Sequence, residues 1–324
     1  MEIARKLNLR FMVRTGFLLY FIYLCAKLWM FYLWAVGEGA YVDRPEAVAG
    51  LIPVGAYMSF FLWLKTGFFD MVAPAGIVII IGALATSFLF KRGFCGWICP
   101  VGAVWHGFGW LGRRLQGRTL RPPRWLDLVL RALRYVIAIA AFGFVGMVSV
   151  AEAISFQQIP YYAVSDIKIL SLLVRITPLY FAVAALVGVA SMLLGNVWCR
   201  YLCPLGGLYG AIGVASPCTV VRDEDICIAC GKCTEVCHAA VKVDELRSVH
   251  APECDGCLDC VVECPAPGAL EPRVLGKWAM PVWLWPVLVV GLWLAIYGVA
   301  KLTGHWDTAV PADLFRIYVN AMGI

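Results

Sequence analysis

Fourteen cysteines carry most of the reactive chemistry in this chain of 324 residues. Two short runs, CIACGKCTEVC at 227–237 and CDGCLDCVVEC at 254–264, share the spacing CxxCxxCxxxC. Runs with this spacing bind [4Fe-4S] clusters, and the fourth cysteine of each run ligates the cluster of the other run. The spacing therefore predicts one cluster on Cys227, Cys230, Cys233 and Cys264, and a second on Cys254, Cys257, Cys260 and Cys237.

Zinc is the alternative metal for closely spaced cysteine pairs. Zinc sites would use two pairs and leave half of these thiols without a metal, so the sequence favours iron and sulfide. The runs differ at one position, where His238 follows the first and Pro265 follows the second. His238 is either a hydrogen-bond donor that tunes a cluster potential or a solvated loop histidine. Cys218 has no partner at a useful spacing, and we interpret it as structural.

A second motif, CxxxCP, occurs in FCGWICPVG at 94–102 and again in WCRYLCPLG at 198–206. Each copy follows a long apolar segment, which indicates an internal repeat of parallel orientation. Three interpretations are open. In the first, the four thiols converge on a metal or a further iron–sulfur centre. In the second, each pair performs thiol–disulfide chemistry, and in the third, the cysteines are small buried side chains where a helix ends. The first interpretation makes metal ligands of Cys95, Cys99, Cys199 and Cys203.

Membrane helices must position these motifs, because the chain is 62% hydrophobic and 15% charged, with a mean hydropathy of +0.80. A transmembrane helix needs about 20 mainly apolar residues. Five segments meet that requirement: 17–36, 71–90, 132–151, 176–198 and 278–300. The apolar segment 51–64 is short and broken by Pro53 and Gly55, which favours a re-entrant or interfacial element over a sixth span.

The distribution of lysine and arginine predicts the orientation, because cytoplasmic loops retain positive charge. Basic residues are frequent in the N-terminal arm and after the second span: Arg5, Lys6, Arg10, Arg14, Lys91, Arg92, Arg113, Arg114, Arg118, Arg121 and Arg124. The opposite loops carry fewer: Arg44, Lys65, Lys168 and Arg175. We therefore expect a multi-pass protein of the cytoplasmic membrane with its N-terminus and cysteine runs inside and its C-terminal tail outside. The net charge of +6 is mostly an orientation signal, and we expect the basic loop to contact anionic lipid. We expect no nucleic acid partner, because the arginines lie beside apolar spans and no nucleic-acid fold is recognisable.

The expected fold is an α-helical membrane protein of about five transmembrane helices with a cytoplasmic ferredoxin-like α+β domain. We divide the chain into 1–216, with four spans and both CxxxCP motifs, 217–273, the two-cluster domain, and 274–324, the fifth helix and a periplasmic tail. In the two-cluster domain, AVKVD at 240–244 is expected to be β-structure. We do not expect so small a domain to fold without its metal.

The segments SFLFKRGFCGWICPVG and VWCRYLCPLG, the double cysteine run and the closing TGHW together resemble the NapH/MauN-type membrane polyferredoxins, relatives of the membrane core of NosR. The resemblance extends from about residue 40 to 308. It implies a bacterial inner-membrane protein that takes electrons from the quinol pool and passes them toward a periplasmic reductase or dehydrogenase. It also implies that the eight cysteines of the two runs are ligands and that those of the CxxxCP motifs are functional.

A quinol site needs an apolar slot and groups that accept protons. In the predicted outward loops, Asp70 and Glu152 are the candidate proton acceptors, and the alternative is that they are ordinary charges at a membrane boundary. Lys27 is a third candidate, since it lies within the first span with Tyr20 and Tyr23 on the same helix face. A snorkelling side chain explains Lys27 equally well.

The expected function is that of an electron-transfer subunit, with quinol dehydrogenase activity within a complex that includes a ferredoxin, cytochrome or reductase. An assembly or maturation factor is one alternative, in which the clusters reduce a metal or thiol in a client enzyme. A scaffold subunit with purely structural clusters is another. Reduction of the clusters by a quinol analogue separates the first function from the alternatives.

Overall fold

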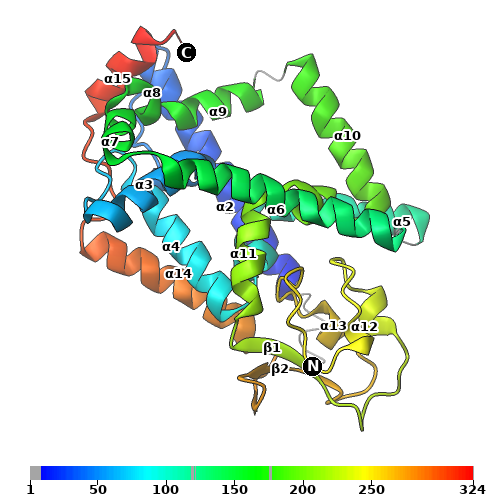
Figure 1. Cartoon of the computed structure of the whole chain (residues 1–324). Helices are drawn as coiled ribbons and strands as arrows, with labels where there is room; N and C mark the ends of the chain where they lie inside the picture. The colour runs from blue at the N-terminus through cyan, green and yellow to red at the C-terminus, as the bar shows by residue number, and fades with distance from the viewer. Residues whose placement is uncertain (1–8, 118–119, 121, 175–176, 324) are drawn as a thin grey trace. The chain divides into compact units, whose positions relative to one another are not determined.

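The structure is a computed structural model of the chain, and it describes residues 9–117, 120, 122–174 and 177–323 (Figure 1). The chain is mostly helical, with a small cysteine-rich region that contains β-strands. Some of the basic residues that predict the orientation lie outside the described residues, namely Arg5, Lys6, Arg118, Arg121 and Arg175.

An apolar helix occupies each of the five predicted spans. These helices are α2 (Leu9–Ala35), α4 (Pro74–Leu89), α6 (Arg124–Met147), α10 (Pro178–Leu194) and α14 (Leu284–Leu302). Among the described residues, three helices are long and apolar enough to cross a membrane: α2, α6 and α14. Helices α4 and α10 are apolar too, but they have 16 and 17 residues. A membrane protein is therefore supported, and the number of spans stays a prediction.

Shorter helices connect and flank these spans. They are η1 (Glu46–Leu51), α3 (Pro53–Thr66), α5 (Pro100–Gln116), α7 (Val150–Gln158), α8 (Pro160–Ala163), α9 (Ser165–Val174), α11 (Pro204–Val214) and α15 (Ala312–Ala321). Helix α3 covers most of the predicted re-entrant segment; it begins at Pro53 and ends at Gly67, whose φ of 73° is left-handed. Helix α15 lies in the predicted tail, where Phe315 and Val319 are buried in one hydrophobic cluster with residues of α2.

The cysteine-rich region combines a small sheet with single helical turns. Strand β1 (Cys218–Arg222) pairs antiparallel with β2 (Leu270–Val274), which pairs with β3 (Trp278–Ala279). The helical turns are α12 (Lys232–Glu235), η4 (Val243–Glu245) and α13 (Asp259–Val262). The prediction of β-structure at 240–244 was wrong. The end of this stretch belongs to the η4 turn, in which Asp244 accepts a hydrogen bond from Thr234.

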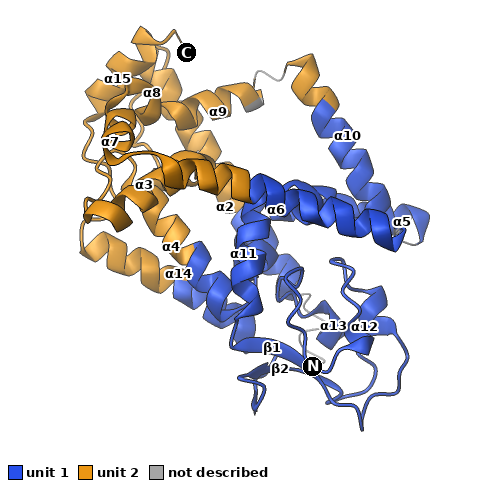
Figure 2. Cartoon of the chain, viewed as in Figure 1, with its two compact units in different colours: residues 1–18, 83–138, 183–292 blue, residues 19–82, 139–182, 293–324 orange. Residues whose placement is uncertain are grey.

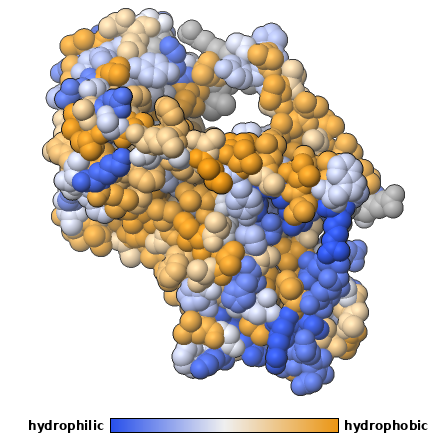
Figure 3. All heavy atoms as spheres, viewed as in Figure 1, coloured by the Kyte–Doolittle hydropathy of each residue, from blue (hydrophilic) through white to orange (hydrophobic). Residues whose placement is uncertain are grey.

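The chain forms two compact units, which are drawn in different colours in Figure 2. Unit 1 comprises residues 1–18, 83–138 and 183–292, and unit 2 comprises residues 19–82, 139–182 and 293–324. Hydrophobic side chains cover much of the visible face (Figure 3). The exposed hydrophobic side chains of α6 include Leu128 and Val136, which are 70% and 61% exposed. Such faces suit contact with lipid. All the predicted cluster ligands belong to unit 1.

Candidate metal centres

Cysteines of both runs line one small cavity in unit 1: Cys237, Cys254, Cys257 and Cys260. The spacing assigned the same four thiols to the second cluster. In the other predicted set, Cys233 and Cys264 are close enough to interact electrostatically. In this set Cys230 is exposed, as is Ile228 two residues before it, whereas Cys233 is buried. One predicted set thus lines a cavity, and the other has one cysteine in contact with solvent.

The backbone repeats the same unusual conformation in both runs. Ala229 and Gly231 have φ values of 52° and 70°, and the equivalent Gly256 and Leu258 have values of 64° and 63°. Left-handed residues between right-handed ones turn successive N–H groups toward one point and make a concave site for an anion. A non-glycine residue in this region is strained. The conformation therefore fits a bound group that carries negative charge.

The thiols around this cavity need a metal to be ionised. Burial raises the pKa of Cys254 to about 11 and raises the pKa of Cys257 and Cys260 well above the ordinary value. A metal ion supplies the positive charge that deprotonates a coordinating thiol. The cavity, its four thiols and its backbone donors together fit a [4Fe-4S] cluster, which would supply a one-electron redox centre.

Each CxxxCP motif folds into the same local structure. One π-helical turn, η2 (Phe94–Ile98) or η3 (Trp198–Leu202), is followed by a cysteine in extended conformation and then by a proline that begins the next helix. Sγ of Cys99 accepts a hydrogen bond from the amide of Gly102 at 3.4 Å, and Sγ of Cys203 accepts one from Gly206 at 3.4 Å. The second cysteine is thus an N-cap and the proline occupies the first helical position. Single π-turns are frequent at functional sites.

The glycine after each CxxxCP motif is required by close packing. A Cβ atom at Gly102 would lie 2.9 Å from the carbonyl oxygen of Cys95, and one at Gly206 would lie 3.2 Å from that of Cys199. A larger residue would force a backbone shift at Gly102 and would be tight at Gly206, where the neighbouring backbone would have to move by a few tenths of an ångström. This packing explains the full spacing CxxxCPxG in both copies.

The structure brings the four CxxxCP thiols together. Cys95 is close enough to Cys99, Cys199 and Cys203 for each of them to raise its pKa, in addition to the dominant effect of burial. The guanidinium of Arg92 opposes these effects. Among the described residues, Nε of Arg92 is buried without a hydrogen-bond partner. Four converging thiols beside an unpartnered cationic donor fit an anionic metal centre better than isolated buried side chains.

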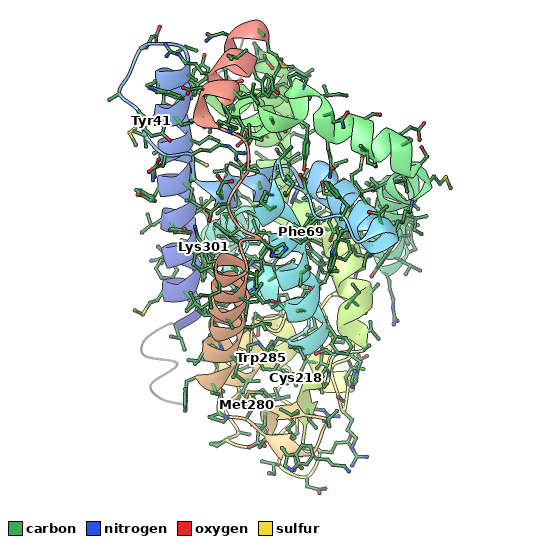
Figure 4. All side chains as sticks on the ribbon, turned by 90° about the vertical axis from the view of Figure 1, so that its left-hand side faces the viewer. Tyr41, Phe69, Cys218, Met280, Trp285 and Lys301 are labelled. Atoms are coloured by element: carbon green, nitrogen blue, oxygen red, sulfur yellow. The ribbon has the colours of Figure 1, made fainter. Side chains whose placement is uncertain are left out.

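The cluster loop of the second run packs directly against the CxxxCP motifs. A Cβ atom at Gly96, inside the first motif, would lie 2.5 Å from the carbonyl oxygen of Asp255. Trp97 Nε1 donates a hydrogen bond to the carbonyl oxygen of Gly256 at 3.0 Å. Trp285, which is fully buried and labelled in Figure 4, covers Gly256 from α14. The two motifs are therefore in backbone contact.

Glu253, the residue before the second run, is held by three arginines. Its carboxylate Oε1 lies 3.0 Å from Arg134 Nη2 and 3.5 Å from Arg131 Nη1, and its carbonyl oxygen accepts a hydrogen bond from Arg92. Arg134 is fully buried. These buried ion pairs fasten the cysteine-rich region to helix α6, and removing one partner would leave an uncompensated charge.

The predicted proton acceptors have structural contacts in unit 2. Asp70 is buried and accepts hydrogen bonds from Ser59 at 2.6 Å and Tyr162 at 2.5 Å, and from the amides of Val72 and Ala73. The carboxylate of Glu152 forms a capping box with Ser149 at the start of α7. Both carboxylates thus stabilise local structure, and their role with quinol stays a prediction.

Lys27 lines a cavity of about 550 Å³ in unit 2. Aromatic rings form much of its wall, including the predicted neighbours Tyr20 and Tyr23, and Tyr41 and Lys301 also border it (Figure 4). Charged residues that the sequence alone did not single out also line the cavity, among them Glu46, whose Oε2 lies 3.1 Å from Arg44 Nη1. Burial raises the pKa of Glu46 to about 6. A size of 300–1,000 Å³ is typical of ligand sites.

Comparison with known families matches the two cysteine motifs to separate family models. A 4Fe-4S binding domain matches residues 72–119 and 176–216, which contain both CxxxCP motifs. A 4Fe-4S dicluster domain matches residues 219–265, which contain both cysteine runs. Iron–sulfur binding is therefore supported for both parts of the chain.

Several known proteins are similar to the chain over most of these regions. YccM of Escherichia coli, named as an electron transport protein, is 34% identical over 295 residues, which cover 89% of this chain and 82% of YccM. The ferredoxin-type protein NapH of E. coli is 30% identical over 60% of this chain and 65% of its own length. The ferredoxin-type protein MauN of Methylorubrum extorquens is 26% identical over 59% of this chain and 62% of MauN. No solved structure matches the chain.

Proposed function

The chain belongs to the NapH/MauN-type family of membrane polyferredoxins, and from that membership we propose that it passes electrons between the quinol pool and a membrane or periplasmic redox partner. Iron–sulfur electron transfer is the activity that its similarity to ferredoxin-type proteins supports. The quinol and the partner are the specific parts of the proposal.

The observation that carries the proposal is the contact between the second run and the first CxxxCP motif. One predicted set includes the exposed Cys230, and the thiols of the other set line the cavity. That cavity is bounded by Asp255 and Gly256, which touch Gly96 and Trp97 of the CxxxCP motif. The residues thus form a series from the surface to the helices, as an electron-transfer route requires.

We assign the four CxxxCP thiols to a further metal centre within this series. Their burial, their mutual proximity and the charge of Arg92 support the assignment. The N-cap hydrogen bonds to Cys99 and Cys203 fix two of the four sulfur atoms. Thiol–disulfide exchange is less favoured, because a reactive thiol has a lowered pKa, whereas burial raises the pKa of Cys99 to about 11.

For the quinol, the cavity beside Lys27 is the most suitable site in unit 2. Its aromatic residues could stack on a flat ring, and charged residues, among them Lys27 and Glu46, also line it. Tyr20 and Tyr23 are more than half exposed on α2, where a ligand could enter from lipid. Oxidation of a quinol to a quinone releases two protons and two electrons. Glu46, with a pKa of about 6, is suited to accept one of these protons near neutral pH, and solvent would take the other. The clusters that the cysteines would hold would accept the two electrons.

Reduction by quinol tests this proposal. Membranes that contain the full chain, prepared without oxygen, are mixed with a reduced short-chain quinol, and bleaching of the cluster absorption is followed. We expect reduction in the wild type, slower reduction in Lys27→Met, and wild-type rates in Lys168→Met, a lysine of α9 away from the cavity. Clusters that dithionite reduces but quinol does not would contradict the quinol link and favour the maturation role.

A further inference from the structure

One guanidinium group contacts the loops of both cysteine motifs. Arg10, near the start of α2, forms an ion pair with Asp259, and its Nη2 lies 3.6 Å from Oδ2 of Asp255. Its Nε donates to the carbonyl oxygen of Gly96 at 3.5 Å. Both aspartates lie between ligand cysteines of the second run, and Gly96 lies between the cysteines of the first CxxxCP motif. Arg10 therefore bridges the two predicted centres.

The same oxygen of Asp255 is the centre of a buried polar network. His238 Nε2 donates to it at 2.9 Å, and His106 Nε2 lies 3.7 Å away. The two imidazole rings are in edge contact, with centroids 4.2 Å apart. On the other side of His238, Nδ1 lies 3.9 Å from Sγ of Cys257. The network thus reaches from the arginine to a predicted cluster ligand.

A bound cation is an alternative for this group, because two imidazoles and a carboxylate can hold a metal ion. Arg10 already places a positive charge beside the carboxylate, and Arg14 also lies close enough to act on His106. A further cation would be repelled by both guanidinium groups. We therefore interpret the group as an anchor for Asp255.

The charge of Arg10 acts on an unusually negative loop. Asp255 and Asp259 both lie beside thiols that an anionic cluster would use, and the Arg10 side chain is only 12% exposed. A buried charge is weakly screened by solvent, and nearby charge is one of the factors that set the potential of an iron–sulfur cluster. Among the described residues, Nη2 of Arg10 makes no hydrogen bond, and its contact with Asp255 is an ion pair at 3.6 Å.

We propose that Arg10 is a positioning residue for electron transfer: it offsets the charge of Asp255 and Asp259, thereby raises the reduction potential of the second cluster, and holds that cluster's loop against the first CxxxCP motif. The inference rests on the proposed function, since it treats the two motifs as successive redox centres. In the step concerned, one electron leaves one centre and enters the other, and no bond forms or breaks.

Redox titration of the anaerobically purified full chain, followed by electron paramagnetic resonance, tests this role. In Arg10→Gln we expect a lower midpoint potential for the second cluster and slower electron transfer between the two centres, with unchanged iron and sulfide content. Asp259→Asn should raise the same midpoint, and the double variant should return toward the wild type. Arg114→Gln removes an exposed arginine at the end of α5 and should change nothing.

Equal midpoints in Arg10→Gln and the wild type, with full cluster content, would overturn the inference and leave the proposed function intact. If the Arg10→Gln protein does not assemble its clusters, the Asp259→Asn variant provides the test. A midpoint potential of the second cluster that does not rise in Asp259→Asn then overturns the role of Arg10. A wild-type chain without any reducible cluster would instead refute the proposed function itself.

Discussion

Replacement of Gly96 by alanine tests the contact between the two cysteine motifs. The added Cβ would lie 2.5 Å from the backbone oxygen of Asp255, whereas ordinary contacts are 3.4–4 Å. The two backbones must therefore separate by roughly an ångström, because the closest atom is a backbone oxygen, which cannot rotate away as a side chain can. Overpacking of this kind costs about 1–3 kcal/mol. We expect that loss of stability together with slower electron transfer between the centres.

Gly107→Ala is the matched control, because Gly107 lies in α5 and an added Cβ would meet no atom within 4 Å in the described part of the chain. Alanine is favoured over glycine in a helix by about 1 kcal/mol, so this variant should be as stable as the wild type or slightly more stable. Thermal unfolding in detergent and flash-reduction kinetics measure the two effects. A Gly96→Ala protein with wild-type stability and wild-type kinetics would refute the close packing described here.

Three further substitutions have defined outcomes. Glu253→Ala leaves Arg134 buried without its carboxylate and should lower the free energy of unfolding by about 3–5 kcal/mol, measured by thermal unfolding. An unchanged unfolding temperature would contradict the buried pair. Quinol oxidation should accelerate as pH rises through about 6, where Glu46 becomes a carboxylate that can accept a proton, and Glu46→Gln should flatten the pH profile. Asp70→Asn weakens the bonds from Ser59 and Tyr162 and should destabilise the chain by about 1–3 kcal/mol, in an unfolding assay, while iron content stays constant.

Local patterns in the sequence predicted much of this architecture. Each predicted span coincides with an apolar helix, because hydrophobic composition over about 20 residues decides whether a helix suits a membrane. The cysteine spacing grouped Cys237 with the second run, and the structure places it in the same cavity. Both patterns are informative because the residues concerned are close in sequence or belong to a repeated motif.

Contacts between distant segments could not be predicted in the same way. Arg10 entered the sequence analysis only as a charge that orients the first helix, yet it pairs with Asp255 and Asp259. Glu46 follows Pro45 in a connection without a recognisable spacing, and only the fold places it in the lining of the cavity that Lys27 also lines. Asp70 was predicted from its position in a loop, and its hydrogen bonds depend on which helices pack around it. Such pairings require the tertiary structure.

Iron and acid-labile sulfide, counted per chain in an anaerobic preparation, test the central claim most directly. The wild type should contain more than about eight irons, since two cubanes hold about eight and the CxxxCP centre adds to them. Substitution of Cys95 and Cys199 by serine should reduce the count to about eight. A colourless wild-type preparation without sulfide would contradict the whole account, and a wild-type count of about eight would remove the CxxxCP centre from it.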